Sequence, residues 1–101
     1  MASLNVLEAL LRYLVDGSWE HGPGLSIRSL DNPGWSISLD LARTEFENAE
    51  ISPIQIQRSD SDWLFIRLER SAFGPHLEID CGVANLTEAV SCLTEVLGLK
   101  L

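Results

Sequence analysis

Apolar residues recur at helical spacing near the N-terminus. From Leu4 to Val15, five leucines fall on one helical face: Leu4, Leu7, Leu10, Leu11 and Leu14. This spacing predicts an amphipathic helix, with Ser3 or Asn5 as its N-cap. Asp16-Gly17 should end the helix, because a glycine just past the last turn readily adopts the left-handed conformation.

A second apolar stripe near the C-terminus also has helical spacing. Its members are Leu86, Ala89, Val90, Leu93, Val96 and Leu97. Asn85 and Glu88 have the spacing of a capping box just before and within this stripe. Gly98 follows it and should end the predicted helix.

Between the two helices, the pattern changes to the two-residue period of strands. From Trp35 to Leu41, apolar residues alternate with Ser36, Ser38 and Asp40, which predicts a half-buried strand. Leu25 to Ser29 predicts its hairpin partner. The segment Asn32 to Trp35 fits a type II turn, with Pro33 at the second position and Gly34 at the third.

Three further strands are expected after a polar connecting segment, Thr44 to Glu50. Ile54 and Ile56 alternate with glutamines, Trp63 to Glu69 alternates along its length, and Leu77, Ile79 and Cys81 follow the Gly74-Pro75 break. The sequence therefore predicts an α+β fold, residues 1–101 forming one domain: an N-terminal helix, an antiparallel meander of four to five strands, and a C-terminal helix. Both helices should cover one face of the sheet. The other face would carry Arg28, Ser36, Ser38, Asp40, Trp63, Phe65 and Arg67.

The charge balance restricts the partners of the protein. Seven basic residues against fifteen acidic ones give a formal net charge of −8. Direct binding to nucleic acid is not expected, because a phosphate backbone requires a basic surface. A basic protein is the expected counterpart, although solubility alone also accounts for an acidic surface.

Other sequence signals are mostly negative. No apolar run approaches the roughly 18 residues that a membrane helix needs, and the N-terminus lacks the pattern of a secretory signal. We therefore expect no membrane partner, and we expect Cys81 and Cys92 to be reduced thiols.

Catalytic and metal-binding chemistry have little support in the sequence. The possible metal ligands are Glu20, His21, Asp31, Asp40, His76 and Asp80. Their spacings match neither a zinc site nor an EF-hand. No basic residue adjoins Cys81 to lower its pKa. We expect no catalytic residue, no metal and no cofactor.

The stretches Trp19-Glu20-His21 and Leu30 to Trp35 frame the predicted hairpin with polar and aromatic residues. One interpretation is structural, with Trp19 and Trp35 in the core and Asp31 and Asn32 bonding their own turn. The other is that Glu20, His21 and Asp31 form a polar surface cluster that binds a partner. The two interpretations are compatible.

The fourth predicted strand carries a second candidate surface. If Leu64, Ile66 and Leu68 face the helices, then Trp63, Phe65 and Arg67 face solvent or a partner. Tryptophan and arginine are enriched among the residues that dominate binding energy at interfaces.

The chain resembles the immunity protein 53 family of bacterial polymorphic toxin systems. The resemblance is carried by Trp19-Glu20-His21, by Leu30-Asp31-Asn32-Pro33-Gly34-Trp35, and by a strand ending in Asp40-Leu41. It extends more weakly to the first helix, to Asp62-Trp63 and to the closing helix. It implies a cytoplasmic protein without catalytic activity that neutralises a cognate toxin domain by occluding its active site.

On this hypothesis, the partner-binding residues are Glu20, His21, Asp31, Asp40, Trp63 and Arg67, with acidic support from Glu45, Glu47 and Glu50. Trp19, Asn32, Pro33, Gly34 and Trp35 form the structural motif. Two alternatives remain. One is a small-ligand-binding or minor enzymatic domain that uses the Glu20/His21/Asp31 cluster or Cys81. The other is a structural homo-oligomer, because the sequence is consistent with a monomer or a homodimer.

Overall fold

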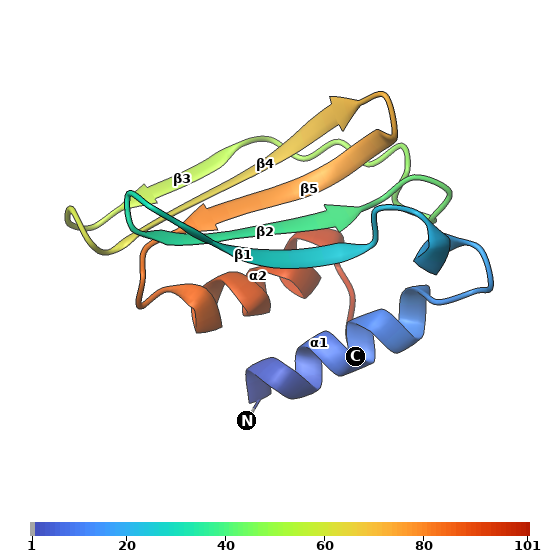
Figure 1. Ribbon diagram of the computed structural model, residues 1–101, viewed down its shortest axis with the longest axis horizontal. Helices are drawn as coiled ribbons and strands as arrows, with labels where there is room; N and C mark the ends of the chain where they lie inside the picture. The colour runs from blue at the N-terminus through green and yellow to red at the C-terminus, as the bar shows by residue number, and fades with distance from the viewer. Residues whose placement is uncertain (1) are drawn as a thin grey trace.

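Five antiparallel strands form one sheet, and two helices cover one of its faces (Figure 1). The computed structural model describes residues 2–101. The elements are α1 (Ala2–Leu14), the short 3₁₀ helix η1 (Trp19–His21), β1 (Leu25–Leu30), β2 (Gly34–Asp40), β3 (Ile54–Gln57), β4 (Trp63–Ser71), β5 (Gly74–Cys81) and α2 (Leu86–Leu97). The predicted α+β fold, with both helices on one face, is confirmed.

Both helices end as the sequence predicts, but the N-cap expected for the first helix, Ser3 or Asn5, is wrong. Gly17 and Gly98 have φ values of 91° and 69°, which only glycine adopts at low cost. The helix α1 begins at Ala2, so Asn5 lies inside it and cannot be its cap. Asn85 does stand at the N-cap of α2 but makes no side-chain capping bond, because its amide binds the β3–β4 loop instead.

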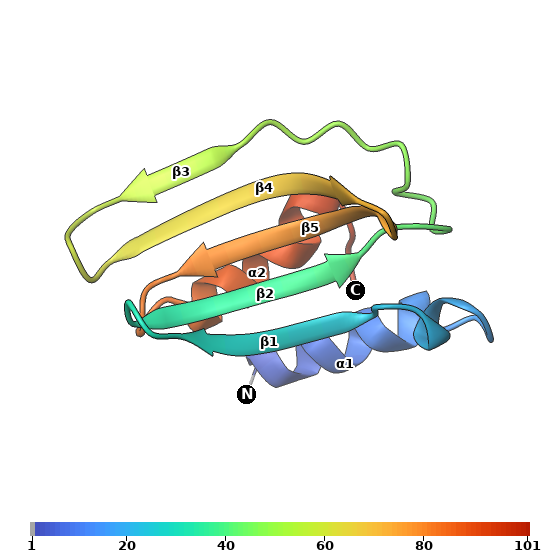
Figure 2. The ribbon, with the colours of Figure 1, turned by 45° about the horizontal axis from the view of Figure 1, so that its top comes forward.

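The strand order is β1-β2-β5-β4-β3 (Figure 2). A meander would place β3 beside β2, and here β5 occupies that position. Residues 41–53 carry the chain from β2 to the far edge of the sheet. The inserted strand suits the centre of the sheet because Leu77, Ile79 and Cys81 are fully buried. It begins at Gly74, so Gly74-Pro75 starts the strand instead of breaking the chain before it.

The β1–β2 connection differs from the type II turn predicted for Asn32 to Trp35. The Asn32-Pro33 peptide bond is cis, and Gly34 is already the first residue of β2, paired with Leu30. Gly34 is needed for another reason. A Cβ at this position would collide with the carbonyl oxygen of Cys81 and would lie 3.4 Å from Cζ2 of Trp63. The glycine therefore lets two backbones and an indole ring approach one another closely.

The register assigns each strand residue to a face. Ile27, Ile37, Ile79, Ile66 and Ile54 pair in one row across all five strands, so they share the face that packs on the helices. Leu10 and Leu14 of α1 and Val90 and Leu93 of α2 complete this core. No helix within residues 2–101 has the length and apolarity to cross a membrane.

Candidate functional site

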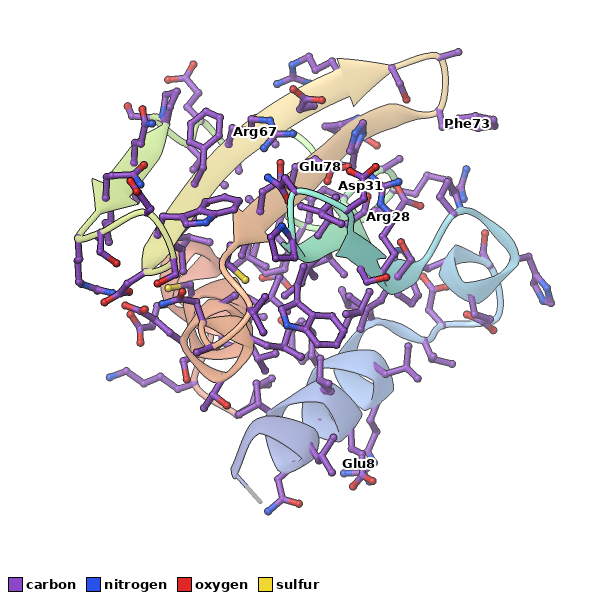
Figure 3. The ribbon with its side chains drawn as sticks, turned by 60° about the vertical axis from the view of Figure 1, so that its left-hand side comes forward. Glu8, Arg28, Asp31, Arg67, Phe73 and Glu78 are labelled. Atoms are coloured by element: carbon purple, nitrogen blue, oxygen red, sulfur yellow. The ribbon has the colours of Figure 1, made fainter. Side chains whose placement is uncertain are left out.

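The face of the sheet opposite the helices is here called the open face. Its members follow from the register: Ser26, Arg28 and Leu30 of β1; Ser36, Ser38 and Asp40 of β2; His76, Glu78 and Asp80 of β5; Trp63, Phe65, Arg67 and Glu69 of β4; Gln55 and Gln57 of β3. Figure 3 shows Arg28, Arg67 and Glu78 on the side away from α1, which carries Glu8. The alternation of polar and apolar residues therefore predicted this face correctly.

Arg67 lies midway along β4, next to the central strand β5, and is held by three contacts. Its Nη1 is 3.1 Å from Oδ2 of Asp80, and its Nε is 3.1 Å from Oε2 of Glu69. Its guanidinium carbon lies 5.0 Å from the ring centroid of Phe65, within the range of a cation–π contact. The arginine is thus pre-positioned by two residues of its own strand, β4, and by one residue of the neighbouring strand β5.

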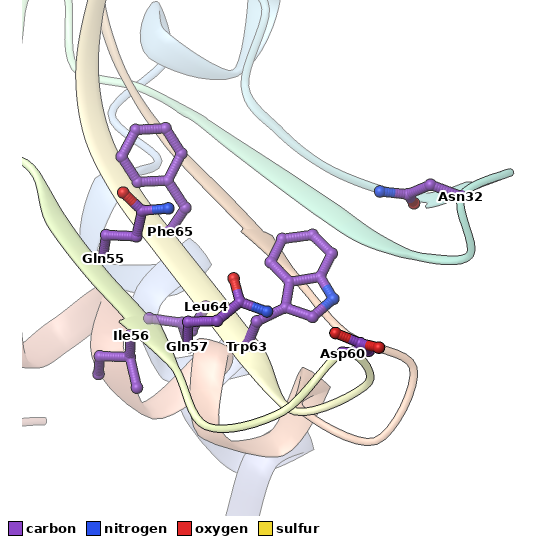
Figure 4. Close-up of a pocket in the computed structure, with 8 residues that line it drawn as sticks. All are labelled: Asn32, Gln55, Ile56, Gln57, Asp60, Trp63, Leu64 and Phe65. Carbon is purple, nitrogen blue, oxygen red and sulfur yellow. The ribbon is translucent and has the colours of Figure 1, made fainter.

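Trp63 borders a hollow of about 290 Å³ at the β1–β2 end of the open face (Figure 4). The indole has Gln57 and Asp60 beside it, with Asn32 across the hollow. Phe65 and Gln55 continue the wall. The site therefore combines a half-buried aromatic surface with amide groups and one carboxylate.

A network of polar side chains links the start of β4 to the N-terminus of α2. The amide of Asn85 accepts the N–H of Trp63 at 3.3 Å and donates to Asp62 at 2.8 Å. Arg58 binds both Asp62, at 2.8 Å, and Glu88, at 2.7 Å. The hydrogen bonds from Asn85 and Arg58 hold the pKa of Asp62 below its ordinary value. The bond from Arg58 does the same for the pKa of Glu88.

Asp40 lies at the opposite end of the open face and is almost completely buried, with 2% of its surface exposed. Its backbone oxygen accepts the indole N–H of Trp19 at 2.9 Å, and its Oδ1 accepts the N–H of Ala42 at 3.0 Å. Asp40 also lines a hollow of about 200 Å³ next to His76 and Phe73. Phe73, at the tip of the β4–β5 hairpin, is 74% exposed.

The structure does not bring Glu20, His21 and Asp31 together, so the expected three-residue cluster is wrong. Glu20 and His21 precede β1, and Asp31 follows it. The strand has six residues, which at ~3.3 Å per residue separates its ends by about 20 Å. Sequence proximity was misleading because an extended strand carries its two flanks apart.

Glu20 has a local structural role. Its carboxylate accepts the backbone N–H groups of Asp16 and Gly17 at 3.1 and 3.2 Å. Backbone hydrogen bonds, including that from its own N–H, keep the pKa of Glu20 below its ordinary value. His21 is exposed and borders a separate hollow with Arg43, Pro23 and Phe73.

Two of the supporting acidic residues, both in the β2–β3 connection, already accept hydrogen bonds from the chain itself. Glu45 accepts a hydrogen bond from the hydroxyl of Tyr13, and Glu47 accepts the N–H of Arg43 at 2.6 Å. Glu50 is exposed. Trp19 is buried in the core, and Trp35 is half-buried on the helix-covered face, where its indole N–H donates to the carbonyl of Val83 at 2.9 Å.

The two cysteines are free, as the sequence predicts. Cys81 faces the helices and is fully buried. Burial raises its pKa to about 11, which disfavours the thiolate that nucleophilic chemistry requires. Within residues 2–101, no three His, Cys, Asp or Glu side chains gather as a metal site would need.

Phe73, Glu78 and Asn85 were not predicted as residues of the site or its supports. Phe73 follows a strand whose end was placed at Glu69, and Glu78 lies in a strand recognised only by its apolar positions. The alternation of Leu77 and Ile79 was sufficient to place Glu78 and His76 on the open face. No local signal assigned Asn85 to the β3–β4 loop, because that contact joins residues 22 positions apart.

Comparison with known proteins gives one match. The family model described as immunity protein 53 matches residues 4–97 of the chain. No curated protein and no solved structure matches this chain.

Proposed function

Because this chain belongs to the immunity protein 53 family, a membership that implies toxin neutralisation in general, we propose that it binds one cognate toxin domain and occludes the active site of that toxin. The open face is the surface proposed for this contact. The observation that carries the proposal is the asymmetry of the sheet. One face is buried by α1 and α2, whereas the other presents Trp63, Phe65 and Arg67, and no helix or strand within residues 2–101 packs over these three side chains.

Trp63 and Arg67 are the proposed anchors of the interface. Both are half-buried and held in place before any partner arrives, Trp63 against Gly34 and Arg67 between two carboxylates. A side chain that is already ordered loses less conformational entropy on binding. Such residues are therefore good candidates for the few contacts that dominate the affinity.

The charge supports a basic toxin domain as the partner. With a formal net charge of −8, the protein would attract a basic catalytic cleft over a range set by ionic strength. Glu20, His21 and Asp31 are all exposed and lie around the two ends of β1. We place them at the rim of the interface, where they would steer association more than they would strengthen the final complex.

This role requires no chemistry from the protein itself, and we propose that it acts in the cytoplasm without catalytic activity. The small-ligand alternative loses its proposed site, because Glu20 and His21 lie apart from Asp31 and Cys81 is buried. A homodimer formed through Trp63 and Phe65 would use the same surface as the toxin. Sedimentation at two protein concentrations distinguishes that alternative from a monomer.

The proposal can be tested by co-expression with the toxin domain encoded beside this protein. Wild type should restore growth, and Trp63→Ala and Arg67→Ala should each reduce the rescue. Leu11→Ala is a matched control, because Leu11 is exposed on α1, on the other side of the sheet. Circular dichroism should show that every variant is folded.

Two results would contradict the proposal. The first is a wild-type protein that neither rescues growth nor forms a complex with the toxin on a sizing column. The second is full rescue by a folded Trp63→Ala, Arg67→Ala double variant, which would exclude the open face as the interface. Association that slows as salt is added would support electrostatic steering.

A further inference from the structure

One oxygen of the buried Asp40 carboxylate has no hydrogen-bond donor. Oδ2 of Asp40 is buried and unpartnered among residues 2–101, as is Oε2 of Glu78. Burying a polar atom without a partner costs free energy, and an ionised carboxylate costs most. Two such oxygens on neighbouring positions of one face therefore require an explanation.

The two carboxylates lie in adjacent rows between β2 and β5. Asp40 pairs with His76, and Ser38 pairs with Glu78. His76 and Glu78 approach within 3.4 Å. The hollow of about 200 Å³ opens here, lined by Asp40, Ser38 and His76 with Ser71, Gly74, Pro23 and Phe73. Asp40 forms part of its wall and is only 2% exposed.

Phe73 forms the outer wall of the hollow. Its ring is 74% exposed at the hairpin tip, while the backbone that carries it leads directly into β5. Figure 3 shows it at the end of the sheet, away from the core. An exposed ring beside a buried carboxylate offers a cation two interactions, with the π face and with the charge.

We propose that this hollow is an anchor pocket for one basic side chain, an arginine or a lysine, of the toxin domain; the inference rests on the proposed function and names the chemistry of the contact. The ammonium or guanidinium group enters between Pro23 and Phe73 and donates to Oδ2 of Asp40. A cation suits the pocket because Oδ2 of Asp40 lacks a donor among residues 2–101 and the whole protein is acidic. The nearby guanidinium of Arg43 does not supply that donor: its Nη2 and Oδ2 of Asp40 lie 3.1 and 3.2 Å from the place a Cβ of Gly22 would take, with no hydrogen bond between them. A metal ion fits less well, because no three-ligand group occurs within residues 2–101.

The pocket can be tested without the toxin. Acetyl-arginine amide is titrated into the protein and followed by amide NMR signals, with acetyl-citrulline amide as its uncharged counterpart. The arginine probe should shift the signals of Gly24, Asp40 and His76 in a saturable manner, and the citrulline probe should not. Asp40→Asn should bind the arginine probe about tenfold more weakly or worse, because a charge-assisted hydrogen bond is lost.

A second variant keeps the test independent of Asp40, whose substitution can disturb the fold. Ser38→Lys places an ammonium group inside the hollow, where it would occupy the site of the partner's cation. It should abolish binding of the arginine probe and raise the melting temperature by satisfying the free carboxylate oxygens. Ser91→Lys adds the same charge on the exposed surface of α2 and should leave probe binding unchanged.

The outcomes separate the pocket from the proposed function. Equal shifts with both probes, shifts outside the hollow, or unchanged binding in Ser38→Lys would overturn the pocket. In the co-expression assay, rescue by wild type and loss of rescue in Ser38→Lys would support it as a toxin anchor. Full rescue by Ser38→Lys would overturn the anchor and leave the proposed function standing. Failure of wild type to rescue would remove the toxin as occupant even if the probe still bound.

Discussion

Two tryptophans offer a matched test of how this fold is held together. Trp19 and Trp35 each donate the indole N–H to one backbone carbonyl at 2.9 Å. The bond from Trp19 to Asp40 is buried, whereas the bond from Trp35 to Val83 is exposed. Phenylalanine removes the donor in both cases and keeps an aromatic ring, so the two substitutions differ mainly in environment.

The expected loss for Trp19→Phe can be worked out from its surroundings. Trp19 is 1% exposed, so the carbonyl of Asp40 would lose a buried donor at a cost of about 1–3 kcal/mol. The smaller ring would leave part of the pocket unfilled, which adds about 1 kcal/mol. We expect a total of about 3 kcal/mol, or a melting temperature lower by roughly 12–24 °C for a domain of this size. For Trp35→Phe, solvent replaces the lost donor, and we expect about 1 kcal/mol or less.

Urea unfolding followed by far-UV circular dichroism measures both variants, because fluorescence would be altered by the substitutions themselves. The slope of the free energy against urea should stay the same, so that a change in midpoint reports stability. Losses for the two variants that differ by less than about 1 kcal/mol would refute the reasoning from the buried carbonyl.

Three further predictions follow from the structure. Gly34→Ala should lower the unfolding free energy by about 1–3 kcal/mol in the same urea assay, because its Cβ would meet the carbonyl of Cys81. Burial raises the pKa values of both cysteine thiols, that of Cys81 to about 11, so alkylation by iodoacetamide at pH 8 should be slow in the native protein and fast in urea; rapid native alkylation of Cys81 would contradict this. The pKa values of Asp62 and Glu88 are lowered from 3.8 and 4.5, so their stabilisation is complete above these values and is lost as the pH falls through the lower folded values. The urea concentration at the unfolding midpoint should therefore decrease as the pH is lowered below about 4.5. In Asp62→Asn this decrease should be less steep.

Much of this fold was predictable from local pattern. The two-residue period of Trp35 to Leu41 and of Trp63 to Glu69 assigned each side chain to the correct face, because side-chain direction alternates regardless of strand order. Strand order itself was not predictable in this way. The insertion of β5 between β2 and β4 depends on contacts between distant parts of the chain, such as Trp35 with Cys81, and no local pattern contains that information.

For the candidate site, too, local pattern predicted some features and missed those that depend on distant parts of the chain. Trp63 and Arg67 were correctly placed on the open face because side-chain direction follows from alternation within one strand. The expected grouping of Glu20 and His21 with Asp31 was wrong because the extended strand β1 lies between them and holds them apart in space. The burial of Asp40 was also missed, because it depends on distant segments of the chain: Trp19 of η1 binds its backbone, and Pro23 and Phe73 line the hollow beside it.

The two faces of the sheet differ in whether their buried polar atoms have hydrogen-bond partners, and this difference bears on function. On the helix-covered face, strand residues such as Ile37 and Ile79 are fully buried against apolar neighbours. On the open face, Asp40 and Glu78 each retain a buried oxygen without a hydrogen-bond partner among residues 2–101. Apolar or hydroxyl side chains at these positions would cost the folded protein less. Departures from local consistency of this kind are expected where a protein meets a partner, and these two carboxylates both lie on the face that no helix covers.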